Sequence, residues 1–152
     1  MLVCFSEQIE ALERTVFVRG RKMPEFEALQ TVPGIGKILG LTITLETGNL
    51  ERFPSVGNYT SYCRCVTSQK LSNGKRKGQG NKKNGNRYLA WAFGEAAHFA
   101  IRFNPGIRRY YQRKATRTKV MVALKAVAHK LARASYYVMR DQVPFEVAKS
   151  FS

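Results

Sequence analysis

Apolar residues recur at spacings of three and four along most of the chain, the pattern of helices that bury one face. Before position 60 this pattern predicts helices over 5–18, 25–30 and 37–46, and another that starts at Ser55, whose hydroxyl can cap it. After a polar interval it predicts helices over 88–102, 107–114 and 116–140. Strand patterns are weak throughout. The expected fold class is therefore all-α, a helical bundle with a long basic loop.

The spacing also predicts which side of each helix faces the core. In 37–46 the candidates are Ile38, Leu41 and Leu45, and in 116–140 the apolar face begins at Val120. The inward face of 88–102 comprises Leu89, Phe93, Ala96, Ala97 and Ala100. The helix over 5–18 is short for an isolated helix, so we expect a partner helix to cover its apolar face.

The interval 67–87 has a different character. It holds four glycines, four asparagines and almost no apolar residues. A loop of that length inside a compact domain is functional or disordered, because an ordinary connection is much shorter.

Charge is distributed very unevenly. The chain has a net charge of +16, and residues 52–140 hold twenty basic residues against one acidic residue, Glu95. A field of one sign repels itself unless a polyanion neutralises it, which favours a nucleic-acid partner. The alternative is a merely solubilising surface, although mixed charges achieve that at lower cost. A membrane surface is disfavoured, because the basic stretch includes a polar, glycine-rich loop.

The three cysteines form no disulfide framework and no zinc motif. Cys63 and Cys65 are closer together than the ligand pairs of zinc sites, and His98 and His129 lie far away in sequence. We interpret all three cysteines as buried thiols in a reducing cytoplasm.

No apolar run approaches the length of a membrane span, and the acidic residues of 1–13 do not fit a signal peptide. The expected location is the bacterial cytoplasm, at the nucleoid.

A glycine turn joins the second and third predicted helices. Gly34 and Gly36 would let the backbone approach a phosphate, as in a helix-hairpin-helix, and amides at the next helix start would point at the anion. Lys37 follows at once and adds a positive charge. The alternative is an ordinary glycine turn between two packed helices.

The polar interval contains a candidate nucleophile, Ser72. Attack on a phosphodiester needs cationic groups around the phosphoryl oxygens. The interval supplies them in Lys75, Arg76, Lys77, Lys82, Lys83 and Arg87. No histidine or acid lies near Ser72 in sequence to accept its proton. From the residues alone, a DNA-gripping loop with an incidental serine remains the stronger interpretation.

A family resemblance covers roughly 29–140. Its motifs are LQTVPGIG at 29–36, RFPS at 52–55, SNGK at 72–75, KNGNRYL at 83–89 and KAVAHKLAR at 125–133. In order and spacing they resemble the C-terminal domain of transposases of the IS one-ten type. These are serine transposases of bacterial insertion sequences that use a bridge RNA. The chain departs from the family pattern at Thr67, where proline is frequent.

The resemblance implies roles for particular residues. Ser72 matches the serine that becomes covalently linked to DNA during strand exchange, and Ser68 is its nearest rival. Residues that the family places around that serine match Lys75, Lys83, Asn86 and Arg87. The basic positions of the closing helix match Lys125, Lys130 and Arg133, which we expect to contact DNA.

The resemblance also implies an organisation. Residues 1–28 would be the end of a connecting coiled coil, 29–142 the DNA-binding and strand-exchange domain, and 143–152 a tail. Family members carry an N-terminal nuclease-like domain with a magnesium-binding acidic cluster, which these 152 residues do not contain. We therefore expect a fragment that needs no cofactor of its own and is inactive alone as a recombinase. In the full-length context we expect a homo-oligomer with DNA and a guide RNA.

Two other functions compete with this interpretation. The first is a non-catalytic DNA- or RNA-binding module that uses the glycine hairpin and the basic helices. The second is a basic protein associated with the ribosome.

Overall fold

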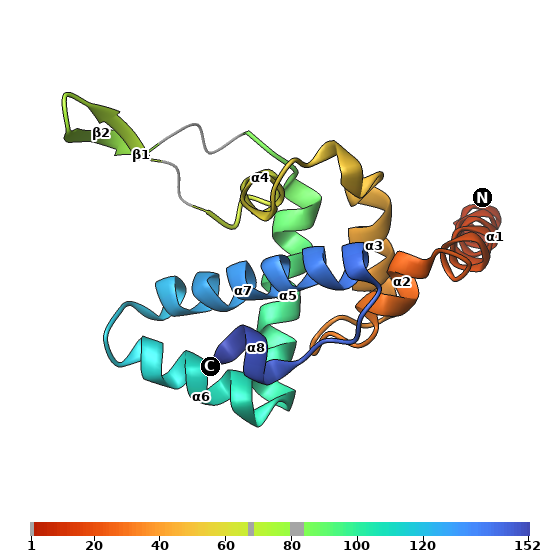
Figure 1. The fold of residues 1–152 in the computed structure, drawn as a ribbon. Coiled ribbons are helices and arrows are strands. Elements are labelled where there is room, and N and C mark those ends of the chain that lie inside the picture. The colour runs from red at the N-terminus through yellow and green to blue at the C-terminus, as the bar shows by residue number, and fades with distance from the viewer. Residues whose placement is uncertain (1, 67–68, 80–83) are drawn as a thin grey trace.

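The computed structural model describes residues 2–66, 69–79 and 84–152, with the backbone alone at 69–72 and 76–79. Figure 1 shows a mainly helical molecule, which confirms the expected fold class. The first half contains α1 (Leu2–Gly20), α2 (Pro24–Leu29), α3 (Lys37–Thr47), the 3-10 turn η1 (Leu50–Arg52) and α4 (Val56–Tyr62). The second half contains β1 (Gln69–Ser72), β2 (Lys75–Gln79), α5 (Arg87–Phe103), α6 (Pro105–Ala115), α7 (Val120–Asp141) and α8 (Val147–Phe151).

Helix α5 runs through the core. It packs against α3, α6 and α7, and its expected inward residues, from Leu89 to Ala100, are all fully buried. Alanines at three of these positions let neighbouring helices approach closely, while Phe93 fills the space between them. Its ring meets the buried Tyr59 ring of α4 edge-on, at 6.4 Å between centroids. Burial of a side chain as large as Phe93 contributes about 1.5–3 kcal/mol.

The inward face of α3 was predicted incorrectly. Ile38 and Leu45 are exposed, whereas Leu39 and Ile43 are buried with Leu41. Nearly every position of this helix is apolar or a threonine, so spacing alone does not select one face. Gly40 lies on the buried side of this helix, where the Gln30, Ile35 and Phe26 side chains pack close to its backbone. Val120, at the start of α7, was also expected to be buried and is exposed.

A β-hairpin occupies part of the interval predicted as loop. Strands β1 and β2 pair antiparallel, with Ser72 opposite Lys75. The two residues between them, Asn73 and Gly74, have φ values of 53° and 74°. Two consecutive positive φ values are what a type I′ turn requires, and Asn-Gly is its preferred sequence. Figure 1 draws this hairpin outside the helical body.

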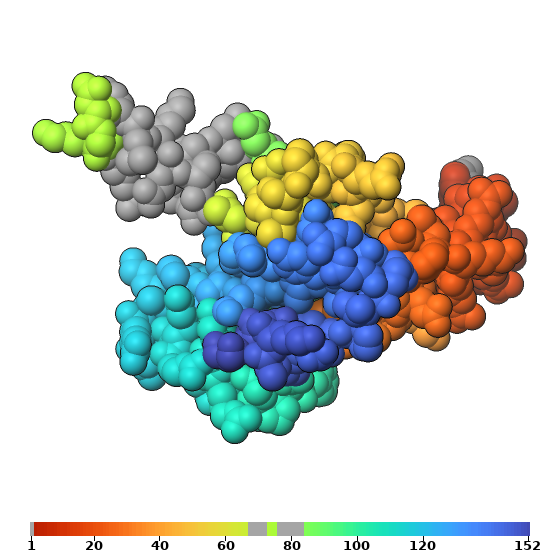
Figure 2. All heavy atoms as spheres, in the orientation of Figure 1, coloured from red at the N-terminus to blue at the C-terminus, as the bar shows by residue number. Residues whose placement is uncertain are grey.

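The C-terminal tail also contains structure that the sequence did not predict. Helix α8 packs against α6 and α7, and Figure 2 shows it between them on one face of the molecule. The Phe151 ring is buried there and meets the Tyr110 ring edge-on. The backbone amide of Phe145 donates to the Thr31 hydroxyl at 3.0 Å, which ties the tail to the turn after α2.

Helix α1 projects to one side of the body (Figure 1). Gly20 is the one buried residue of Leu2–Gly20, and a Cβ there would lie 2.1 Å from a methyl group of Leu41. The apolar side chains of Phe5, Ile9 and Leu12 are exposed. No other helix of the described chain covers them, so the expected partner for this helix stays a prediction. Among the described helices, none is both long and apolar enough to span a membrane.

Candidate nucleic-acid interface

The long basic segment is closed at its base by three hydrogen bonds. The backbone amide of Asn86 donates to the Tyr62 carbonyl at 2.7 Å. The Arg64 guanidinium donates to the carbonyls of Asn84, at 3.1 Å, and Gly85, at 3.4 Å. Gly85 has a φ of 97°, and a Cβ there would lie 2.5 Å from the Tyr62 carbonyl oxygen. Residues on both sides of the hairpin are therefore fixed to each other and to the helical body.

Asn86 is the centre of that closure. Its side-chain oxygen caps α5 by accepting from the amides of Tyr88 and Leu89, at 2.9 Å and 3.0 Å. Its side-chain nitrogen donates to the Glu46 carboxylate at 2.7 Å and to the Tyr62 hydroxyl at 3.3 Å. That bond and the nearby Arg52 guanidinium lower the pKa of Tyr62. Asn86 was predicted to contact DNA, and these bonds show a structural role that the sequence did not reveal.

Ser72 ends β1, at the tip of the hairpin. Its cross-strand partner Lys75 has an exposed side chain, as does Asn73 in the turn. The hairpin therefore brings the serine backbone directly opposite that of a lysine. Arg76 and Lys77, which were also expected to contact DNA, lie in β2. The structure describes only their backbone. Lys82 and Lys83 lie outside the described residues.

The glycine turn between α2 and α3 has two different positions. Gly34 has a φ of 86°, and a Cβ on it would lie 2.2 Å from the Ala96 carbonyl oxygen of α5. The Gly34 backbone therefore approaches another helix of the same protein, whereas the sequence predicted that it would approach a phosphate. At Gly36 a Cβ would meet nothing within 4 Å, and Lys37 beside it is exposed. Of the three predicted contacts in this turn, Gly36 and Lys37 are the ones open to a ligand.

The basic residues of α7 divide in the same way. Lys125 and Arg133 are exposed. Lys130 is half-buried, and its ammonium donates to the Ser150 carbonyl at 2.8 Å and lies 5.0 Å from the centroid of the Tyr110 ring. Burial, and then the positive charge of Arg133, lower the pKa of Lys130. Lys130 therefore helps to hold α8, while its contact with DNA stays a prediction.

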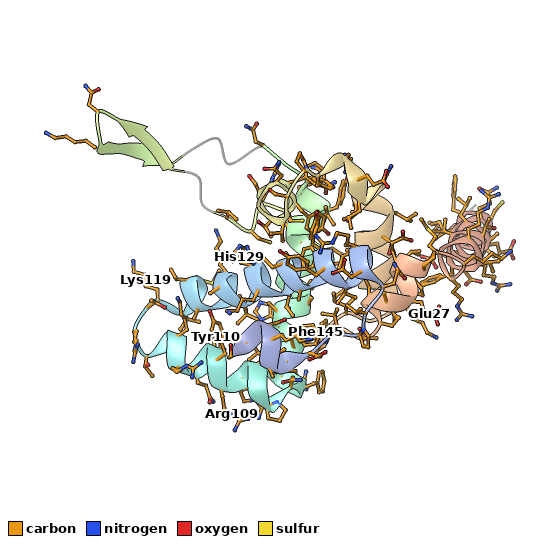
Figure 3. The ribbon with its side chains drawn as sticks, viewed as in Figure 1. Glu27, Arg109, Tyr110, Lys119, His129 and Phe145 are labelled. Atoms are coloured by element: carbon orange, nitrogen blue, oxygen red, sulfur yellow. The ribbon has the colours of Figure 1, made fainter. Side chains whose placement is uncertain are left out.

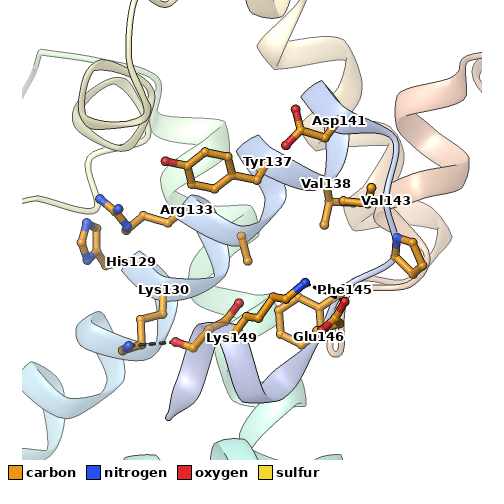
Figure 4. A pocket seen from close by; sticks show the side chains of 13 residues that line it. His129, Lys130, Arg133, Tyr137, Val138, Asp141, Val143, Phe145, Glu146 and Lys149 are labelled. Carbon is orange, nitrogen blue, oxygen red and sulfur yellow. Dashed lines mark hydrogen bonds and ion pairs between the residues drawn. The ribbon is translucent and has the colours of Figure 1, made fainter.

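A hollow of about 770 Å³ lies between α7 and the tail. Figure 4 shows His129 and Arg133 at one end of it, and Lys149 bonded to Glu146 on the tail side. Burial, followed by the charges of Arg133 and Lys130, lowers the pKa of His129, so this imidazole is neutral at neutral pH. Arg133 is exposed at this end, whereas the Lys130 ammonium is already bonded to the Ser150 carbonyl.

A further group of cations was not singled out by the sequence. They lie along α6 and in the turn that leads to α7, and Figure 3 labels two of them, Arg109 on α6 and Lys119 just before α7. We call this group the basic elbow; its exposed members are Arg109, Arg113, Lys114, Arg117 and Lys119. The signal was present in the charge count of the sequence, but no motif marked these positions.

The thiols differ in their environment. Cys63 is buried and Cys65 is half-buried, and burial raises the pKa of Cys65 to about 12 and also raises that of Cys63. Both are therefore inert thiols, as expected. Cys4 was expected to be buried as well, but it is exposed on α1. Among the described residues, no three histidine, cysteine or acidic side chains are grouped where they could hold a metal ion.

Comparison with known proteins relates the sequence to transposases of insertion elements. The model of the transposase family IS116/IS110/IS902 matches residues 26–112, from α2 through the hairpin to α6. An "insertion element IS110 uncharacterized 43.6 kDa protein" of Streptomyces coelicolor is 26% identical over 146 residues, which is 95% of this chain. The chain spans 36% of the length of that relative. Because the family model matches more than half of the chain, the protein belongs to the IS116/IS110/IS902 family of transposases.

Proposed function

We propose that the chain binds DNA through its basic surfaces and that Ser72 is the nucleophile of DNA strand exchange in transposition. Membership of a transposase family supports a role in transposition. The observation that carries the finer proposal is the hairpin itself, in which Ser72 pairs with Lys75 beside the Asn-Gly turn. An exposed turn in a segment whose two ends are fixed to the helical body can carry one serine to a DNA backbone.

The proposed chemistry is a transfer of one phosphodiester bond. The Ser72 hydroxyl oxygen attacks phosphorus, and a new P–O bond forms as one bridging P–O bond of the strand breaks. The serine proton passes to a base, and the departing sugar oxygen takes up a proton. Attack by a sugar hydroxyl on the phosphoserine reverses these steps and joins a new strand. Lysine and arginine around the phosphate stabilise the negative charge that develops during both steps.

The base and the metal are proposed to come from elsewhere. In the sequence, no acid stands between Glu51 and Glu95, on either side of Ser72. We propose that the nuclease-like domain of a full-length family protein supplies an acidic, magnesium-binding cluster. We also propose that a guide RNA and a second copy of the protein take part. The isolated chain should therefore bind DNA without cleaving it.

Besides the hairpin with its cations, the proposed DNA contacts lie on two further surfaces. One is the turn that contains Gly36 and Lys37, and the other comprises Lys125 and Arg133 of α7 together with the basic elbow. Arg87, beside the base of the hairpin, is exposed and adds to these contacts. All of these positions suit phosphate contacts, which position a protein on DNA without reading its sequence. If the serine is idle, the same surfaces describe the second candidate function, a non-catalytic DNA- or RNA-binding module.

A covalent-adduct assay tests the catalytic proposal. The chain is combined with the N-terminal domain of a family member, its guide RNA, magnesium and radiolabelled target DNA, and denaturing gels detect linked protein. We expect an adduct that Ser72→Ala abolishes while DNA affinity is nearly unchanged, because one hydroxyl adds little beside many cations. Ser68→Ala is the matched control and should leave the adduct in place.

Two results would contradict the assignment of Ser72. One is an adduct that survives Ser72→Ala and that peptide mapping locates at Ser68 or at a tyrosine. The other is the absence of any adduct under conditions in which the full-length family member becomes linked to the same DNA. The second result would favour the binding module.

A further inference from the structure

Two aromatic side chains stand exposed at the start of α5. Tyr88 is 49% exposed and Trp91 is 51% exposed. Because they are three residues apart in a helix, they share one face, opposite the buried face that Leu89 and Phe93 form. Neither ring is needed to fill the core of this chain.

The cationic neighbour of this pair is Arg87. Its guanidinium lies 4.9 Å from the centroid of the Tyr88 ring and donates to the Tyr88 hydroxyl at 2.8 Å. Arg87 is exposed, so it can hold the ring in place and still face a phosphate. The nearest acid along the helix is Glu95, one turn beyond Trp91. An anionic strand on this face therefore finds its cationic contact at the Arg87 end of the pair.

The position of the pair in the fold is fixed. Asn86 caps α5 immediately before Arg87, and its backbone amide is bonded to the Tyr62 carbonyl at the base of the hairpin segment. The two rings therefore stand where the basic segment rejoins the helical body.

We propose that Tyr88 and Trp91 form a stacking platform for unpaired bases of a nucleic-acid strand. This inference rests on the proposed function, that the chain binds nucleic acid. Every base has a π face that stacks on an aromatic side chain, whereas in a duplex these faces are covered by neighbouring base pairs. A strand that has been cut must leave its complement before it joins another, so strand exchange produces unpaired bases. A second copy of this chain is a poorer occupant, because it carries the same charge of +16.

The chain contains a built-in reporter for this contact, because Trp91 is its single tryptophan. The full chain is titrated with a single-stranded oligothymidine and, separately, with a blunt duplex of equal length. Fluorescence anisotropy of labelled DNA measures binding, and tryptophan emission measures stacking. At equal saturation we expect the single strand to quench Trp91 emission much more than the duplex does.

Substitutions test whether the rings contribute to affinity. Trp91→Leu and Tyr88→Leu should each weaken single-strand binding by roughly 5- to 100-fold, the range expected for the loss of one stacked base. Trp91→Phe retains a ring and should recover most of the affinity. Phe5→Leu is the matched control, because Phe5 is an exposed aromatic residue on α1, which carries none of the proposed DNA contacts. It should leave single-strand affinity unchanged.

The outcomes separate this inference from the function on which it rests. If both DNAs bind, but Trp91 emission is unchanged and Trp91→Leu binds the single strand normally, the platform is wrong and DNA binding stands. If Trp91→Leu instead dissociates an oligomer in sedimentation experiments, the face is a protein interface and the platform is again wrong. If neither DNA binds, the proposed function itself fails.

Discussion

Gly34 and Gly36 belong to the same turn, yet different physical requirements apply to them. At Gly34 a positive φ of 86° coincides with a contact in which a Cβ would overlap the backbone of α5. At Gly36 the backbone is extended, with φ −88° and ψ −167°, and the space in front of it is open. The sequence predicted one role for both glycines, because residue types do not reveal which neighbour a backbone approaches. Gly34 is required by internal packing, and Gly36 is free to serve a ligand.

Substitutions at these two glycines should therefore behave differently. Gly34→Ala should lower the free energy of unfolding by more than about 2 kcal/mol, because both the clash and the positive φ oppose a side chain. Gly36→Val should retain the fold and weaken DNA binding equally for all sequences, because a branched side chain keeps the backbone away from phosphate. Urea denaturation and DNA titrations measure the two effects. If Gly34→Ala is as stable as the parent chain, the packing argument is contradicted. If Gly36→Val folds and binds DNA with undiminished affinity, the turn has a structural role only.

Among the elements, α5 and the hairpin mark the limits of prediction from sequence. The buried face of α5 was predicted correctly except that Ala92, also buried, was missed, because the apolar residues of this helix lie mainly on one side. The hairpin was not predicted, because its strands are short and lack the alternation of a half-buried strand. The Asn73-Gly74 turn was the available signal. Likewise the basic elbow is visible as one group only in the structure, where the cations of α6 and of the turn before α7 are exposed.

The elbow provides a prediction about DNA binding. Replacing Arg109, Lys114 and Arg117 with alanine should weaken binding to all duplex sequences. The log–log salt slope should become shallower by about 0.9 for each lost phosphate contact. The control replaces Arg19, Arg21 and Lys22 with alanine, which removes the same amount of positive charge. These three residues are exposed at the end of α1 and just after it. If both triple variants lose affinity equally, net charge and not the elbow is responsible; if neither does, DNA does not bind at the elbow.

At the scale of the molecule, the mainly helical fold and the uneven charge could be read from sequence. The position of the tail could not, because α8 depends on a pocket for Phe151 formed by residues distant in sequence. The roles of Asn86 and Lys130 also required the fold, since their partners Glu46 and Ser150 lie 40 and 20 residues away. Polar side chains that the sequence suggests as ligand contacts can therefore instead form hydrogen bonds that stabilise the fold. The exposed cations that remain are those on which the proposed function depends.

The salt dependence of DNA affinity tests the central claim most directly. A labelled duplex is titrated with the chain at several salt concentrations, and the logarithm of the association constant is plotted against that of the salt concentration. If the basic surfaces bind phosphates, the slope should be about −0.9 for each contact, or near −5 for about six contacts. Affinity should then fall by roughly a thousandfold between about 50 and 200 mM salt. A slope near zero, or no binding at low salt, would contradict the assignment of these surfaces to nucleic acid.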